Sequence, residues 1–142
     1  MTWARHVTRS EAGTERVAAE LARACPAGAV MLLHGELGAG KTAFVRGVAA
    51  GRGIDPDEVS SPTFVVVQEY GEGALQHVDL YRLGPDEVDD LGLEELAEAG
   101  AVVCVEWAER WRHPPADAMT IRITVVGEDE RELTVIRRPA VS

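Results

Sequence analysis

One eight-residue segment carries most of the chemistry that the sequence predicts. Residues 35–42 read Gly-Glu-Leu-Gly-Ala-Gly-Lys-Thr and match the pattern G-x-x-x-x-G-K-[ST] without a mismatch. Glycines at these positions let backbone N–H groups turn toward a phosphate, and the positive end of the following helix adds to that attraction. Lys41 would reach the terminal phosphate oxygens, and the Thr42 hydroxyl would bind Mg²⁺. The segment therefore predicts a nucleotide-binding loop.

The basic residues of the chain support this interpretation of Lys41. It is the single lysine among 14 basic residues, all the others being arginine, and asparagine is absent. A compact ammonium group suits this position better than a bulky planar guanidinium. Guanine-specific loops of the N/T-K-x-D type need a second lysine, so ATP or dATP is favoured over GTP.

The elements that must position this loop are visible on both sides of it. The apolar run 29–33 is short enough for a buried strand and leads directly into the loop. Residues 41–50 repeat apolar side chains at helical spacing, and Ser10 is a suitable N-cap for an earlier helix over 11–24. The predicted order is strand, glycine-rich loop, helix.

The rest of the chain predicts mainly strands. The predicted strands are 64–70, 75–80, 101–105, 119–126 and 132–136, and the segment 85–96 predicts two short helical turns that break near Gly92. The last two strands form an antiparallel hairpin that is expected to close the sheet. The sequence therefore predicts an α/β fold with a mixed sheet of the P-loop NTPase type, flanked by helices.

Length, charge and composition exclude several classes of protein. The 142 residues suit one domain, expected over 1–138 with a short tail at 139–142. A net charge of −10 disfavours direct binding of nucleic acid by this chain. No apolar run approaches the ~20 residues of a membrane span, and Cys25 and Cys104 lack CxxC partners. A cytoplasmic location without membrane association is expected.

Two acidic residues and one threonine are further candidates for phosphate chemistry. Asp79 and Glu106 each follow an apolar strand, where a carboxylate can hold Mg²⁺ or orient water, although each also fits an exposed strand end. Thr63 follows Ser61 and Pro62 in a loop that could close over a γ-phosphate or be a simple turn.

Three other residues leave their roles open. His77 fits a hydrogen-bonded strand histidine better than a catalytic base. Trp107 and Trp111 have helical spacing, so they fit either core packing or a partner surface.

The short chain lacks the arginine-rich lid of small-molecule kinases, so hydrolysis or nucleotide switching is preferred. A kinase and a nucleotide-gated binding module without turnover remain the alternatives.

Four blocks of the sequence together resemble the TsaE (YjeE) family, the bacterial ATPases of tRNA threonylcarbamoyladenosine (t6A) synthesis. The four blocks are Leu33 to Thr42, Ser61-Pro62-Thr63-Phe64, His77-Val78-Asp79-Leu80-Tyr81-Arg82 and Val105-Glu106-Trp107. Their order and spacing agree with the family over nearly the entire chain. The resemblance implies Mg²⁺-dependent ATP binding and slow hydrolysis to ADP that depends on a TsaB–TsaD complex, with tRNA contacted only indirectly.

The resemblance also implies roles for individual residues. Lys41 would hold phosphate, Thr42, Glu106 and Asp79 would serve Mg²⁺, and Thr63 would belong to a switch-like loop. Catalysis would rest on Lys41, Asp79, Glu106 and Thr63. The implied nucleotide contacts are Gly38, Ala39, Gly40, Lys41, Thr42, Ala43, Glu11, Thr14 and Arg131. Ala43 stands where the family commonly has a second threonine.

Overall fold

The computed structural model describes residues 2–36, 38–59 and 66–137, and the side chains from Ala4 onward. Thr63 and the expected tail at 139–142 lie outside these ranges. The strands are β1 (Thr2–Thr8), β2 (Val30–Gly35), β3 (Val67–Tyr70), β4 (Leu75–Asp79), β5 (Val102–Glu106), β6 (Met119–Val125) and β7 (Arg131–Arg137). The helices are α1 (Glu11–Ala24), α2 (Lys41–Gly51), α3 (Pro85–Asp89) and α4 (Leu93–Glu98), with 3-10 turns η1 (Pro56–Glu58) and η2 (Ala108–Arg110).

Within the described residues, seven strands form one mixed sheet in the order β1-β7-β6-β2-β5-β4-β3. The central strand β2 pairs in parallel with β5 and β6, and β4 pairs in parallel with β5. The pairs β3–β4, β6–β7 and β1–β7 are antiparallel. The carboxyl ends of β2, β4 and β5 therefore meet at one edge of the sheet, where open α/β sheets bind their ligands.

Strand β1 corrects the expectation that the C-terminal hairpin closes the sheet. The β6–β7 hairpin is present as predicted, but β1 pairs along the whole of β7, from Thr2 opposite Arg137 to Thr8 opposite Arg131. The first ten residues contain no apolar run, because β1 is an edge strand with one side toward solvent. Its pairing is with residues at the other end of the chain, which a local pattern cannot indicate.

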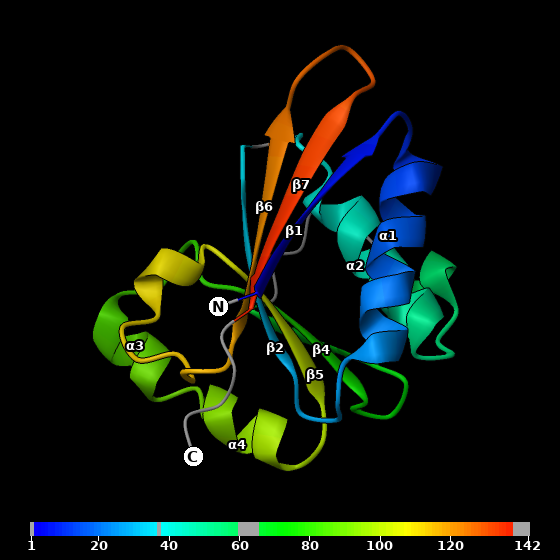
Figure 1. Ribbon diagram of the computed structural model, residues 1–142. Coiled ribbons are helices and arrows are strands. Elements are labelled where there is room, and N and C mark those ends of the chain that lie inside the picture. Colours follow the sequence, from blue (N-terminus) through cyan, green and yellow to red (C-terminus); the bar gives the residue numbers. More distant parts are fainter. Residues whose placement is uncertain (1, 37, 60–65, 138–142) are drawn as a thin grey trace.

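Two hydrophobic layers hold the sheet between its helices (Figure 1). Helices α1 and α2 cover one face, where the core includes Phe44, Val48 and Leu133. Helices α3 and α4 cover the other face, over a core that includes Val78 and Val105. Alternate residues of β4 and β5 point into these two layers, which fixes the side of the sheet on which each polar strand-end residue lies.

Helices α1 and α2 pack unusually close together. A Cβ atom on Gly47 would collide with the carbonyl oxygen of Glu15 and the methyl group of Ala18. One turn later, a Cβ on Gly51 would lie 2.5 Å from the carbonyl oxygen of Ala19. Glycine is therefore required at both positions for this approach, and the close contact anchors the body of α2, whose first residues are Lys41 and Thr42.

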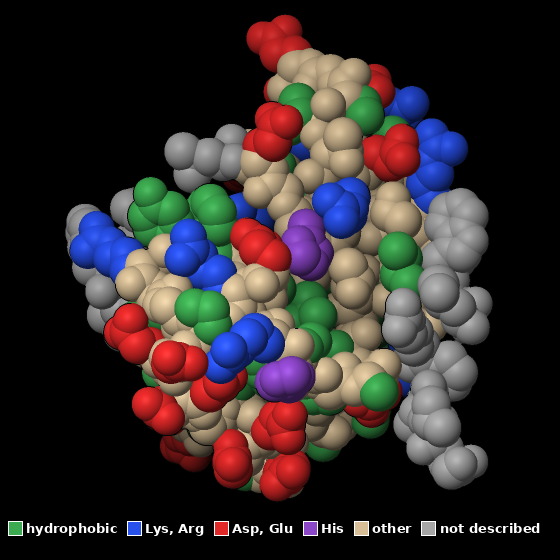
Figure 2. All heavy atoms as spheres, turned by 90° about the vertical axis from the view of Figure 1, so that its left-hand side faces the viewer, with side chains coloured by type: hydrophobic (Ala, Val, Ile, Leu, Met, Phe, Trp, Pro, Cys, Tyr) green, Lys and Arg blue, Asp and Glu red, His purple; other side chains and the backbone are tan. Residues whose placement is uncertain are grey.

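The face covered by α3 and α4 is strongly acidic (Figure 2). Acidic side chains gather along its lower edge, and those exposed on the two helices are Asp86, Glu87, Asp89, Glu94, Glu95 and Glu98. Arg112 forms ion pairs with Asp86 and Asp89 at 3.0 and 2.5 Å. In the described part of the chain, no helix has the length and apolar character needed to cross a membrane.

Candidate functional site

The glycine-rich loop between β2 and α2 leaves its inner side open. Gly38 and Gly40 have φ angles of 82° and 111°, which disfavour any residue with a Cβ. A Cβ built on either glycine meets no atom within 4 Å, so the space beside the backbone is clear. Ala39, between them, is fully buried and its N–H donates to the carbonyl oxygen of Glu36. We refer to the open space beside Gly38 and Gly40 as the glycine cradle.

Helix α2 begins directly at the end of this cradle. Gly40 is its N-cap and, having no side chain, provides no side-chain hydrogen bond to the first turn. The first N–H groups of a helix have no partner within the helix, so these donors and the helix dipole favour an anion here. Lys41 and Thr42 are the first two residues of α2 and are both partly buried. Ala43 is buried behind them.

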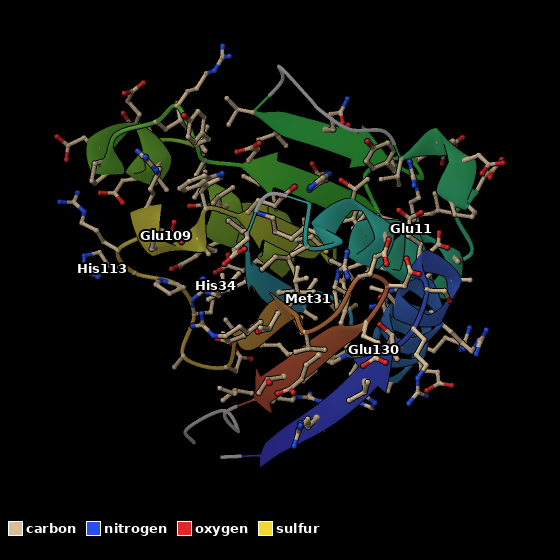
Figure 3. The ribbon with its side chains drawn as sticks, turned by 90° about the horizontal axis from the view of Figure 1, so that it is seen from above. Glu11, Met31, His34, Glu109, His113 and Glu130 are labelled. Atoms are coloured by element: carbon tan, nitrogen blue, oxygen red, sulfur yellow. The ribbon has the colours of Figure 1, made fainter. Side chains whose placement is uncertain are left out.

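Arg131, at the start of β7, is joined to the same loop. Its Nε donates to the carbonyl oxygen of Ala39 at 3.0 Å, and its Nη1 donates to the carbonyls of Gly127, Glu128 and Glu130 in the β6–β7 turn. Seen from above, Glu130 and Glu11 lie on one side of the molecule, while His34 lies toward the side of Glu109 and His113 (Figure 3). Arg131 therefore reaches the loop from the hairpin side.

The two α1 residues among the implied nucleotide contacts differ in exposure. Glu11 is exposed in the first turn of α1. Thr14 is buried, and its Oγ1 lies 2.8 Å from the Oγ1 of Thr8 on β1. The structure therefore places Thr14 in the junction between β1 and α1, with its hydroxyl already paired.

The strand ends bring the acidic candidates together opposite the loop. Asp79 on β4 and Glu106 on β5 are direct register partners, and both are the last residues of their strands. Leu75 on β4 and Cys104 on β5 pack in the core under α1 and α2, so the alternation places His77, Asp79 and Glu106 on that face as well. The Asp79 Oδ1 accepts a hydrogen bond from the backbone N–H of Tyr81 at 2.9 Å.

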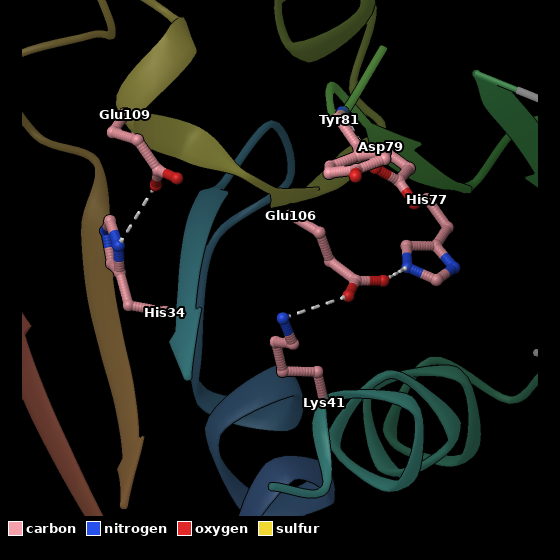
Figure 4. A network of polar contacts seen from close by, with 7 residues as sticks. All are labelled: His34, Lys41, His77, Asp79, Tyr81, Glu106 and Glu109. Carbon is pink, nitrogen blue, oxygen red and sulfur yellow. Dashed lines mark hydrogen bonds and ion pairs between the residues drawn. The ribbon is translucent and has the colours of Figure 1, made fainter. Parts of the chain in front are cut away.

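Glu106 is the centre of a polar network (Figure 4). Its Oε1 lies 3.7 Å from the Nζ of Lys41, and its Oε2 lies 2.6 Å from the Nε2 of His77. Burial alone raises the pKa of the Glu106 carboxyl, but His77 and Lys41 lower it by more, so the pKa lies below its usual value. Glu106 is therefore an anion at neutral pH, held between a lysine and an imidazole.

His34, at the carboxyl end of β2, belongs to the same region. Its Nδ1 lies 3.7 Å from the Oε2 of Glu109. Burial lowers the pKa of His34, and the positive charges of Arg122 and Lys41 lower it further against the opposing effect of Glu109. The imidazole is therefore predominantly neutral at pH 7, which keeps a second cation away from Lys41.

Trp107 follows Glu106 and forms an exposed aromatic rim with Tyr81. The ring centroids are 4.8 Å apart, the Trp107 ring lies 5.9 Å from the Nζ of Lys41, and Arg110 lies over both rings. Trp107 has a φ of 57°, rare for a residue with a Cβ. Trp111 is instead buried in the core under α3 and α4. The structure thus separates the two tryptophans, which spacing alone left equivalent.

The structure places Glu106 beside Lys41 and in register with Asp79, and it adds contacts that the sequence did not predict. His77 is buried as a strand histidine, as the sequence favoured, and its Nε2 contacts Glu106, a partner that the sequence did not predict. The signal was its position two residues before Asp79, since this spacing on a strand places both side chains on one face. Tyr81 and Arg110 were not predicted as neighbours of the site. Thr63 lies outside the described residues.

Fold and loop together define a P-loop NTPase-like α/β protein, with a mixed sheet and a C-terminal antiparallel hairpin. The model of the family "Threonylcarbamoyl adenosine biosynthesis protein TsaE" matches residues 8–133. The chain belongs to the TsaE family.

Individual relatives agree with this membership. The chain is 43% identical over 124 residues to the tRNA threonylcarbamoyladenosine biosynthesis protein TsaE of Bacillus subtilis, covering 85% of this chain and 77% of the relative. The Treponema pallidum protein of the same name is 39% identical, covering 92% and 98%. A crystal structure of Bacillus subtilis YdiB superimposes with a TM-score of 0.78 at 33% identity, covering 96% of this chain and 86% of that chain.

Proposed function

We propose that this protein is the Mg²⁺-dependent, ATP-binding and ATP-hydrolysing subunit required for t6A modification of tRNA. In this proposal it acts in the cytoplasm with a TsaB–TsaD type complex, its intrinsic activity is low, and it contacts tRNA only through that complex. Membership of the TsaE family supports the pathway. The observation that carries the ATPase proposal is Lys41, 3.7 Å from Glu106 beside an open glycine cradle.

The residues around the loop fit a Mg²⁺–nucleotide. The open space beside Gly38 and Gly40 and the first backbone N–H groups of α2 would suit a β-phosphate. The Thr42 hydroxyl and the carboxylates of Asp79 and Glu106 are the hard oxygen ligands that Mg²⁺ prefers. Bound there, Mg²⁺ would neutralise charge that develops on the phosphate oxygens. These three residues are the proposed metal ligands, directly or through water.

Lys41 and Glu106 would exchange partners when nucleotide binds. In the present structure each neutralises part of the other's charge. A nucleotide phosphate offers Lys41 a stronger anion, which would leave Oε1 of Glu106 free to face the metal or the attacking water. Asp79, beside Glu106, would serve the γ-phosphate side. Thr63 is proposed to act in a loop that closes on this phosphate.

Surface features support action through protein partners. Tyr81 and Trp107 are exposed, and tryptophan, tyrosine and arginine are the residues most enriched at binding hot spots. The acidic face over α3 and α4 would repel the phosphates of RNA (Figure 2). An exposed aromatic rim beside an acidic surface suits contact with a protein better than direct contact with tRNA.

The test is phosphate release from ATP and Mg²⁺, measured with this protein alone and then with TsaB and TsaD. Release that rises on adding the partners supports the proposal. A labelled phosphorylated metabolite would instead identify a small-molecule kinase, and tight ATP binding without turnover in every mixture would identify a nucleotide-gated binding module. Lys41→Ala should abolish nucleotide binding, while Asp79→Ala should impair hydrolysis more than binding. Turnover equal to wild type in both variants would refute the site.

A further inference from the structure

The His77 imidazole is buried in the sheet with a single polar contact among the described residues. Its side chain is 4% exposed, and its Nε2 lies 2.6 Å from the Oε2 of Glu106. Within the described part of the chain, no group forms a hydrogen bond with Nδ1. Since a carboxylate oxygen only accepts, we assign the proton to Nε2, which donates to Glu106.

This contact divides the two oxygens of Glu106 between two neighbours. Oε2 is held by His77 from β4, and Oε1 faces Lys41 at the start of α2. The terminal torsion of a glutamate is otherwise broad, so an unanchored carboxylate exchanges its oxygens easily. With Oε2 bound to a group fixed inside the sheet, Oε1 is the oxygen presented to the loop.

Packing alone does not explain a histidine at this position. His77 pairs in register with Cys104 on β5 and with Gln68 on β3, and its neighbours along β4, Gln76 and Val78, are buried. An apolar side chain would fill the same volume without leaving a buried ring nitrogen unpaired, which is unfavourable. The hydrogen bond to Glu106 is the described interaction that an apolar residue cannot replace.

We propose that His77 is a positioning residue, which orients Glu106 so that Oε1 faces the Mg²⁺–nucleotide. The inference rests on the proposed function, because it takes a Mg²⁺–nucleotide as the ligand of the loop. Groups that orient a metal ligand from behind typically change metal affinity or activity 10- to 100-fold when they are removed. His77 would contact neither the nucleotide nor the metal.

A matched pair of substitutions tests this role. His77→Gln and His77→Met have similar length, but only glutamine keeps an N–H donor. ADP affinity is measured by calorimetry, once with Mg²⁺ and once with EDTA. We expect His77→Met to raise the Kd for ADP about tenfold or more with Mg²⁺ and to leave it unchanged with EDTA. His77→Gln should retain most of the wild-type affinity. With the partners present, kcat/KM for ATP should fall in His77→Met and recover in His77→Gln.

The control for the substitution itself is His113→Met, because His113 is an exposed histidine that follows η2. Thermal unfolding checks the fold of each variant, and His77→Phe replaces His77→Met if the latter does not fold. The inference is overturned if His77→Met binds ADP as tightly as the wild type in Mg²⁺. It is also overturned if His77→Met loses ADP affinity equally with Mg²⁺ and with EDTA, or if His77→Gln and His77→Met lose it equally. Failure of the wild-type protein to bind ADP would instead refute the proposed function, and this inference with it.

Discussion

Arg131 and Ala39 join the β6–β7 hairpin to the nucleotide loop. The Arg131 Nε donates to the Ala39 carbonyl oxygen at 3.0 Å, across 92 positions of sequence. The same guanidinium holds three carbonyl oxygens of the hairpin turn. The shape of the loop therefore depends on the hairpin as well as on α2.

Replacing Arg131 by methionine should loosen the loop. We expect the free energy of unfolding to fall by about 1–2 kcal/mol, because hydrogen bonds from a partly buried charged group are lost. The Kd for ADP should rise about three- to tenfold, equivalent to about one neutral hydrogen bond. Chemical denaturation and calorimetry measure the two effects. Arg137→Met, on the exposed end of β7, is the control, and an equal loss of ADP affinity there would contradict a specific role for Arg131.

Glu106→Gln should have opposite effects with and without metal. The carboxylate lies 3.7 Å from the Lys41 Nζ, so it competes with a phosphate for the ammonium and also repels the phosphate. In EDTA the variant should bind ADP about three- to tenfold more tightly, as expected when one partly screened charge is removed. With Mg²⁺ it should bind more weakly, because an amide is a poorer ligand than a carboxylate. Glu109→Gln is the control, and a change of the same sign under both conditions would contradict this competition.

We predict that His34 lowers the free energy of unfolding in mild acid. Burial, Arg122 and Lys41 lower its pKa in the folded protein against the effect of Glu109, so the unfolded chain takes up a proton first as the pH falls below about 6.5. The contribution of His34 to the free energy of unfolding is therefore complete above that pH and decreases progressively below it. Denaturant unfolding at pH 8, 7, 6 and 5 should show a smaller decline for His34→Gln than for the wild type. His113→Gln is the control, and parallel declines in wild type and His34→Gln would exclude the effect.

Trp107 should report nucleotide binding by its fluorescence. Its ring lies 5.9 Å from the Lys41 Nζ, an ammonium that would move toward a bound phosphate. Adding ADP and Mg²⁺ should change the tryptophan emission of the wild type, and Trp107→Phe should lose most of that change. Trp111→Phe, at a buried position, should retain it. A full response from Trp107→Phe would show that the signal comes from elsewhere.

The parts of the fold that local signals specify were predictable. Helix α1 has the predicted bounds, 11–24, because Ser10 caps it and an apolar stripe runs along it. The strand, glycine loop and helix around Lys41 also follow from adjacent residues. The register of β4 against β5 does not, and that register brings His77 to Glu106 across 29 positions. Strand β1 was not predicted for the same reason, because its partner β7 is distant in the sequence.

Strand β1 protects the outer edge of β7 from pairing with other molecules. Strand β1 occupies the outer edge of β7 along its full length, from Thr2 to Thr8. Without it, seven residues of β7 would present unpaired backbone groups to other molecules, and such an edge templates intermolecular association. A recombinant version that starts at Ser10 would keep the nucleotide loop but would be prone to aggregate.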